Sequence, residues 1–162
     1  MVRLAGDKRR AQILDAINHH LAAFVSTAGP SDKQMLHATL ILFPDVSPED
    51  APDLIDRIKE ELKPSFVQQG LMLGEFPPRN ESPDLHNPDF RRFRSPIPML
   101  AIRRMVSTDF VFLNRSEYDA ATRLRYLEAY LAAPGIPEYS REEVKRATNS
   151  LRAELRDDAS KD

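Results

Sequence analysis

The sequence predicts a small α+β fold, a two-layer sandwich in which a sheet of three or four strands is covered by helices. Three observations carry this prediction. Helix signals alternate with short apolar runs, and one capped helix lies between two such runs. Residues 77–98 hold six of the thirteen prolines and no glycine, so we expect a long ordered loop over the sheet. A single domain should cover residues 1–156, with a frayed tail over 157–162.

The first predicted helix runs from Asp7 to Val25. Its apolar residues recur every three to four positions, which is the spacing of one buried helix face. The stripe consists of Ile13, Ile17, Leu21 and Phe24, widened by Leu14 and Val25.

A βαβ-like unit follows. The apolar run Ala38–Phe43 predicts a strand. Ser47 as N-cap and Pro48 at the first helical position predict the start of a second helix, which Pro64 ends or kinks. Leu71–Phe76 is then the returning strand, so strand, helix and strand lie at the spacing of a crossover connection.

The C-terminal part begins with a strand over Met99–Arg103, after the proline-rich loop. The run Val106–Leu113 predicts a fourth strand. A third helix is expected over Ser116–Ala132, capped by Ser116, and a fourth from Ser140, whose capping box is completed by Glu143.

Composition excludes several classes of function. A net charge of −2 argues against a nucleic-acid-binding protein, because such proteins carry a basic excess. The chain has no cysteine, so disulfides, thiol nucleophiles and thiolate metal sites are excluded. No apolar run reaches the length of about 18 residues that spans a membrane, and the first residues lack the apolar core of a signal peptide. We therefore expect a cytoplasmic protein.

Arginines gather around the loop, with six in residues 79–104 against three acidic residues. Guanidinium groups match the oxygens of carboxylates and phosphates, so this density predicts a pocket for a small anionic molecule. The expected ligand-binding residues are Arg91, Arg94, Arg103 and Asn87. The alternative is that the arginines are paired within the protein, with Glu75, Glu81 or Asp109 as partners.

Two side chains are the candidate proton-transfer groups, Glu75 on the second strand and His86 in the loop. Glu75 could act as a base, or it could only hold the loop in place. His86 could transfer a proton, or it could only form a hydrogen bond with a backbone carbonyl. No paired carboxylate, glycine-rich phosphate loop or nucleophile elbow is present, and the histidines lack metal-ligand spacing. The sequence therefore predicts no metal site and leaves open whether the protein is an enzyme.

Three runs resemble an uncharacterised bacterial domain family, namely Gly70–Phe76, Leu85–Arg91 and Ser95–Val106. They carry the pattern Gly-Glu-Phe, then Asn-Pro-x-Phe-Arg, then Ser-Pro-x-Pro-x-Leu-Ala-Ile-Arg. The resemblance implies an actinobacterial origin and a setting in specialised metabolism. This chain has Pro77 where the family has a histidine, and it lacks the family's Cys-Pro-Phe element, which implies a binding-only member if those residues act in relatives.

Three functional hypotheses follow. In the first, the loop holds a small anionic metabolite and the protein binds or transforms it. In the second, the protein is a non-catalytic accessory domain whose loop contacts a protein partner, and a homodimer is one such arrangement. In the third, haem binds through His86 or His37, since the family's Cys-Pro-Phe element is similar to one in haem-dependent N-oxygenases. The sequence names no other cofactor.

Overall fold

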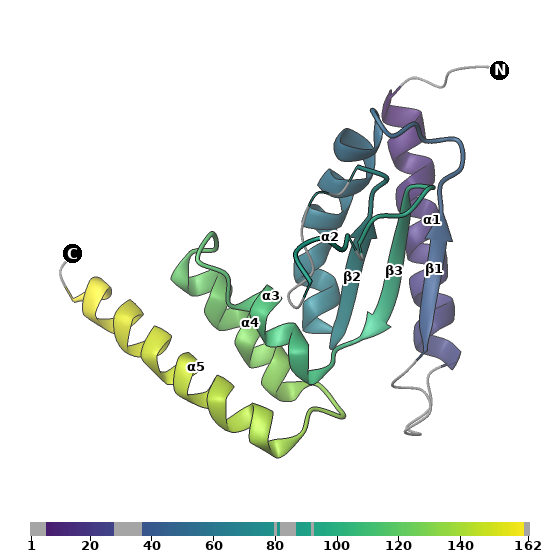
Figure 1. The fold of residues 1–162 in the computed structure, drawn as a ribbon. Helices are drawn as coiled ribbons and strands as arrows, with labels where there is room; N and C mark the ends of the chain where they lie inside the picture. The colour runs from purple at the N-terminus through teal and green to yellow at the C-terminus, as the bar shows by residue number, and fades with distance from the viewer. Residues whose placement is uncertain (1–5, 28–36, 80, 82–86, 92, 161–162) are drawn as a thin grey trace. The chain divides into compact units, whose positions relative to one another are not determined.

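The computed structural model describes residues 6–27, 37–79, 81, 87–91 and 93–160. Helices and a three-stranded antiparallel sheet are mixed along the chain, which confirms the predicted α+β class (Figure 1). No helix within these residues is long and apolar enough to cross a membrane. The elements are α1 (Gly6–Thr27), β1 (Ala38–Leu42), the π-helical segment η2 (Pro52–Asp56), α2 (Arg57–Gln68), β2 (Leu71–Phe76), β3 (Met99–Arg104), the 3-10 turn η3 (Ser107–Asp109), α3 (Phe110–Leu113), α4 (Ala120–Ala132) and α5 (Glu138–Ala159).

The chain divides into two compact units. The first, which we call the sheet unit, comprises the described parts of residues 1–63 and 73–103. The second, the helical unit, comprises residues 64–72 and the described part of 104–162. The prediction of a single domain with a tail from residue 157 stays a prediction, although α5 itself continues to Ala159.

The sheet has the strand order β1-β3-β2. β1 is antiparallel to β3, with Leu40 opposite Ala101. Since β3 lies between the other two strands, β1 and β2 run in the same direction on either side of it. The predicted βαβ-like unit is therefore split, with α2 connecting two strands that do not touch.

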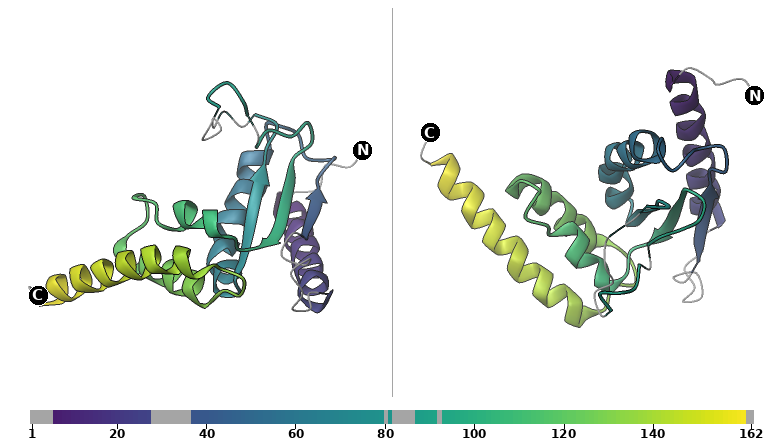
Figure 2. Two further views of the ribbon diagram at one scale, coloured as in Figure 1. Left: turned by 60° about the horizontal axis from the view of Figure 1, so that its bottom comes forward. Right: turned by 45° about the horizontal axis from the view of Figure 1, so that its top comes forward.

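One face of the sheet is covered by helices, and both views in Figure 2 show α1 and α2 on the same side of it. Alternate side chains of each strand point to this side. The apolar residues buried in the sheet unit include Ile13, Ile17, Ile41, Ile55, Ile58, Leu100 and Ile102. On β2, Glu75 contacts Lys59 in the first turn of α2, so Glu75 lies on the helix-covered face. The neighbouring residue Phe76 therefore lies on the opposite face.

The second helical segment begins later than its sequence signal predicts. The Ser47 hydroxyl accepts the backbone N–H of Asp50 at 3.1 Å, but the π-helical segment begins at Pro52 and not at Pro48, and its N-cap is Ala51. Of the two outcomes predicted at Pro64, an end of the helix is excluded, because α2 continues to Gln68. Phe66 and Val67, in the next turn, are almost completely buried, and their burial offsets the cost of about 3 kcal/mol that an internal proline brings.

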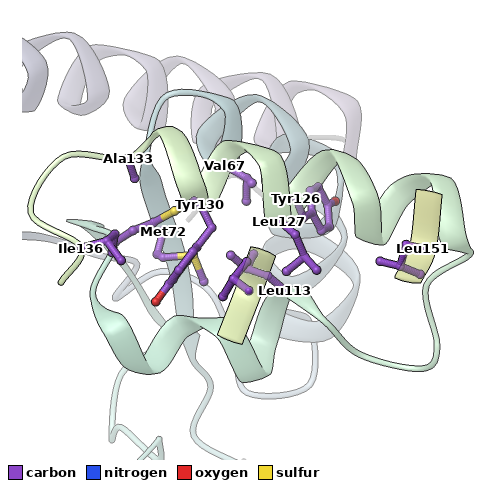
Figure 3. Close-up of a cluster of buried hydrophobic side chains, with 11 residues drawn as sticks. Val67, Met72, Leu113, Tyr126, Leu127, Tyr130, Ala133, Ile136 and Leu151 are labelled. Carbon is purple, nitrogen blue, oxygen red and sulfur yellow. The ribbon is translucent and has the colours of Figure 1, made fainter. Parts of the chain in front are cut away.

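The helical unit has an apolar core whose two buried aromatic side chains both come from α4 (Figure 3). Tyr126, Leu127 and Tyr130 line one face of α4 at the three-to-four spacing of a buried helix face. The Tyr130 hydroxyl donates to the carbonyl of Ser107 at 2.9 Å, so its polar atom is satisfied. The other buried members are Val67, Met72, Met105, Leu113, Ala133, Ile136, Val144 and Leu151.

Arg141 closes the connection between α4 and α5. Its guanidinium donates to the carbonyls of Ala133 at 2.8 Å and of Ile136 at 3.0 Å, and also to that of Leu131. Helix C-termini leave carbonyls without partners, and one planar fork here satisfies two at the end of α4 and that of Ile136 in the connection.

The sequence predictions fail at three places in this unit. Residues 107–113 form η3 and α3 instead of a fourth strand, because the Asp109 carboxylate accepts the Val106 N–H at 2.8 Å and starts a turn. The cap of α4 is Asp119, which accepts the Thr122 N–H at 2.8 Å, and not Ser116. α5 begins after Pro137, ahead of the predicted capping box at Ser140.

Candidate functional site

The sheet unit carries a groove of about 530 Å³ in the proline-rich loop. It is open to solvent and combines two guanidinium groups with an exposed aromatic ring. Its lining consists of Pro78, Asp89, Phe90, Arg91, Arg94, Ser95 and Pro96.

Two consecutive turns build the groove. In the first, the Phe90 N–H donates to the Asn87 carbonyl at 3.1 Å, and the Asn87 side chain accepts the Asp89 N–H at 3.0 Å. Asparagine followed by proline is typical of such a turn, because the side chain mimics a backbone acceptor and the ring presets φ. In the second turn, the Arg94 N–H donates to the Arg91 carbonyl at 2.9 Å.

The loop is attached to the sheet on the face away from the helices. The Phe93 ring lies 6.0 Å from the Phe76 ring of β2, centroid to centroid. Ser95 is buried, and the Phe43 N–H donates to the Pro98 carbonyl at 2.9 Å, which extends the pairing of β1 with β3 by one residue. The expected position of the loop over the sheet is thus confirmed for its described residues.

Arg91 and Arg94 converge on one carboxylate. The Arg94 Nη2 lies 2.5 Å from Glu81 Oε1, and the Arg91 Nε lies 3.7 Å from Glu81 Oε2. The Nε of Arg91 is buried and has no hydrogen-bond acceptor, while its Nη1 donates to the Pro88 carbonyl. Of the internal partners considered from the sequence, Glu81 is the one that both arginines meet. Its side chain is 75% exposed, so solvent competes with this contact.

The other predicted site residues within the described part of the chain do not line the groove. Asn87 shapes the first turn, and Arg103 lies on β3 opposite Ala38. Glu75 lies on the helix-facing side of β2 and not beside the loop arginines of the groove. His86 lies outside the described residues, and His37 is exposed immediately before β1. No group of three histidine or acidic side chains within the described residues could hold a metal ion.

Glu75 belongs to a second charged cluster, formed with Asp56 and Lys59. The Lys59 Nζ lies 3.1 Å from Glu75 Oε2 and 2.6 Å from Glu60 Oε1. Asp56, the last residue of the π-helical segment, has a buried Oδ1 with no hydrogen-bond partner. Burial, reinforced by the negative charge of Glu75, raises the pKa of Asp56 to about 6.

Lys59 is the cation of this cluster. Burial acts to lower its pKa, but the carboxylates of Glu75 and Glu60 outweigh burial and raise the pKa above its ordinary value. Asp56 can therefore exchange a proton near neutral pH beside a permanently charged lysine. Sequence reasoning missed Asp56, since its spacing from Lys59 is that of an ordinary surface ion pair and the π-helical segment has no sequence signal. The groove does not include Asp56.

Comparison with known proteins gives a family and no further relative. The model of a family described as a domain of unknown function, DUF6875, matches residues 1–145. No curated protein and no solved structure matches the chain. The match takes in the whole sheet unit and the helical unit as far as Lys145 of α5.

Proposed function

The chain belongs to the DUF6875 family, and we propose that it binds a small anionic molecule with an apolar part in the loop groove. The observation that supports this function is the convergence of Arg91 and Arg94 on the single exposed carboxylate of Glu81. A setting in specialised metabolism stays a prediction of the family resemblance.

In this proposal, the Glu81 carboxylate occupies the position that a carboxylate or phosphate group of the ligand would take. Exposed ion pairs contribute about 0–1 kcal/mol, so a ligand anion can replace this side chain at little cost. The incoming anion would also supply an acceptor for the Arg91 Nε, which lacks one. Phe90, 56% exposed, and the neighbouring prolines offer an apolar surface for the rest of the ligand.

The proposed function is binding. Asp56, whose pKa is raised to about 6, and its neighbour Glu75 do not line the groove. The described carboxylate that lines it is Asp89.

The test is a titration followed by NMR, reading the arginine Nε–H and phenylalanine ring signals. The probes are phenylacetate, inorganic phosphate and the neutral phenylacetamide. We expect phenylacetate to shift the signals of Arg91 and Phe90 and the amide to leave them unchanged. Arg91→Gln and Arg94→Gln should each weaken phenylacetate binding about tenfold, the equivalent of one charge-assisted hydrogen bond. Glu81→Gln should strengthen it, because the internal competitor is removed.

Arg79→Gln is the matched control. Arg79 is also an exposed arginine of this loop and is paired with Glu49, but it does not line the groove. Equal binding of the acid and the amide would contradict the proposal, and so would a loss of affinity in Arg79→Gln as large as that in Arg94→Gln.

A further inference from the structure

β1 is an edge strand with an unusual surface. It lies at one end of the sheet order β1-β3-β2. Leu40 and Leu42 are each 52% exposed, and Ala38 is exposed as well. These three residues alternate with the buried Ile41 along the strand, so they share one face.

The outward backbone groups of β1 belong to the same three residues. Phe43 donates to Pro98, so the pair Phe43–Pro98 is hydrogen-bonded, and in an antiparallel ladder such pairs alternate with non-bonded ones. With the register of Leu40 opposite Ala101, the residues whose N–H and C=O groups point away from β3 are therefore Ala38, Leu40 and Leu42. No described residue pairs with these groups.

This edge lacks the features that prevent strands from associating. Proteins protect free edges with charged residues, prolines or bulges. The strand sequence Ala-Thr-Leu-Ile-Leu contains no charge, no proline and no glycine, and its register with β3 is continuous. Sheet edges of this kind are sites of strand pairing.

We propose that β1 pairs in antiparallel fashion with β1 of a second copy of this chain, about a two-fold axis at Leu40. This register places Leu40 opposite the partner's Leu40 and Ala38 opposite the partner's Leu42. Because the three outward-facing residues are spaced evenly about Leu40, it is the register in which all of their N–H and C=O groups find partners. A two-fold axis pairs the same surface on both copies, as most soluble homodimers do.

The side chains of β1 favour a second copy of the same strand as the partner at this edge. A small residue, Ala38, meets a large one, the partner's Leu42, and leucine meets leucine at the centre. No charged side chain lies within the paired segment, so self-pairing brings no like charges together. The two copies would join their three-stranded sheets into one continuous sheet.

Single cysteines test the register, since the natural chain has none. In Leu40→Cys the two Cα atoms would lie about 5.5 Å apart, within the range of a disulfide, so mild oxidation should give a covalent dimer. In Leu42→Cys the two Cα atoms would lie about 14 Å apart, because four residues of strand separate them, and no crosslink should form. The two positions are equally exposed, so reactivity alone does not distinguish them.

Sedimentation velocity on the unmodified chain is the second measurement. The mean mass should rise from monomer to dimer with concentration, and Leu40→Lys should raise the dissociation constant at least tenfold by placing two ammonium groups opposite each other. Val111→Lys, at a position of α3 that is 51% exposed, should leave dimerisation unchanged. Far-UV circular dichroism verifies folding of each variant.

Two outcomes overturn the proposal. A monomer at every concentration, without a Leu40→Cys crosslink, would mean that the edge is free or serves a different protein. A Leu42→Cys crosslink as fast as that of Leu40→Cys would mean that the register is wrong.

Discussion

The two units treat their buried polar groups differently. In the helical unit the Tyr130 hydroxyl and the half-buried Arg141 guanidinium donate to backbone carbonyls, and the buried Asp109 carboxylate accepts the Val106 N–H. Among the described residues, the buried side-chain atoms without a hydrogen-bond partner are Asp56 Oδ1 and Arg91 Nε, both in the sheet unit. Buried polar groups are normally satisfied, so each exception needs an explanation.

This difference in buried polar groups concerns which part of the molecule is available to a ligand or a partner. Satisfied polar groups around an apolar core stabilise a structure and leave nothing for a ligand to bind. Groups that lack partners are instead available to a ligand, a proton or another chain. The groove, the Asp56 cluster and the β1 edge all lie in the sheet unit, so both proposed interactions concern this unit.

The largest effect is expected from Leu127→Ala, in the core of the helical unit, where Leu127 is fully buried. The lost contacts and the cavity should lower the free energy of unfolding by about 3–4 kcal/mol. Hydrogen exchange should accelerate in α4 and α5, and binding of phenylacetate to the folded protein should be unchanged. Equally faster hydrogen exchange in β1 and β3 would mean that the two units do not open separately, and would contradict this prediction.

A smaller decrease in the free energy of unfolding is expected from Lys59→Met. This substitution leaves the carboxylates of Asp56 and Glu75 without the cation of their cluster. Because the cluster is only partly buried, we expect a loss of about 2 kcal/mol at pH 7, measured by urea denaturation. The loss should shrink at pH 5, where Asp56 is mostly protonated.

Lys145→Met is its control, since Lys145 also contacts two glutamates, Glu138 and Glu142, but on an exposed surface of the helical unit. Lys145→Met should change the free energy of unfolding little. If both lysine variants lost the same stability, the partial burial of the Asp56 cluster would have no energetic consequence.

The smallest effect is a gain in stability from Asp56→Asn. The folded state raises the pKa of Asp56 from 3.8 to about 6, so it holds this proton more tightly than the unfolded state does. That contribution is fully present below about pH 4 and is lost as the pH rises through about 6. Asparagine has no proton to lose, so the variant should exceed the unmodified chain by about 1–2 kcal/mol above pH 6, after allowing for solvent screening, and match it below pH 4.

Thermal unfolding at a series of pH values measures this difference. Asp53→Asn, at an exposed position one turn earlier, should reproduce the pH profile of the unmodified chain. A gain in Asp56→Asn that is constant from pH 4 to pH 8 would show that proton binding is not its cause.

Within the candidate site, the sequence identified the loop and its arginines but not how they combine. Arg91 and Arg94 could be named because arginine density and proline content are local properties. That Arg103 does not line the same groove depends on the path of the whole loop over the sheet. The partner of Glu75 could not be predicted either, since the contact with Lys59 depends on how α2 packs against β2.

By itself, the sequence determined the three strands, the approximate positions of the four longer helical segments and the turn at Asn87. Each depends on neighbouring residues, through side-chain periodicity, a cap or the restricted φ of proline. Only the tertiary structure decided that α2 continues through Pro64, that residues 107–113 form helical turns and that the pKa of Asp56 is raised to about 6. For α2 and Asp56 the cause is burial against other segments of the chain, which can outweigh a local preference of a few kcal/mol. At residues 107–113, burial of Asp109 and Leu113 acts together with the local hydrogen bond from the Val106 N–H to Asp109.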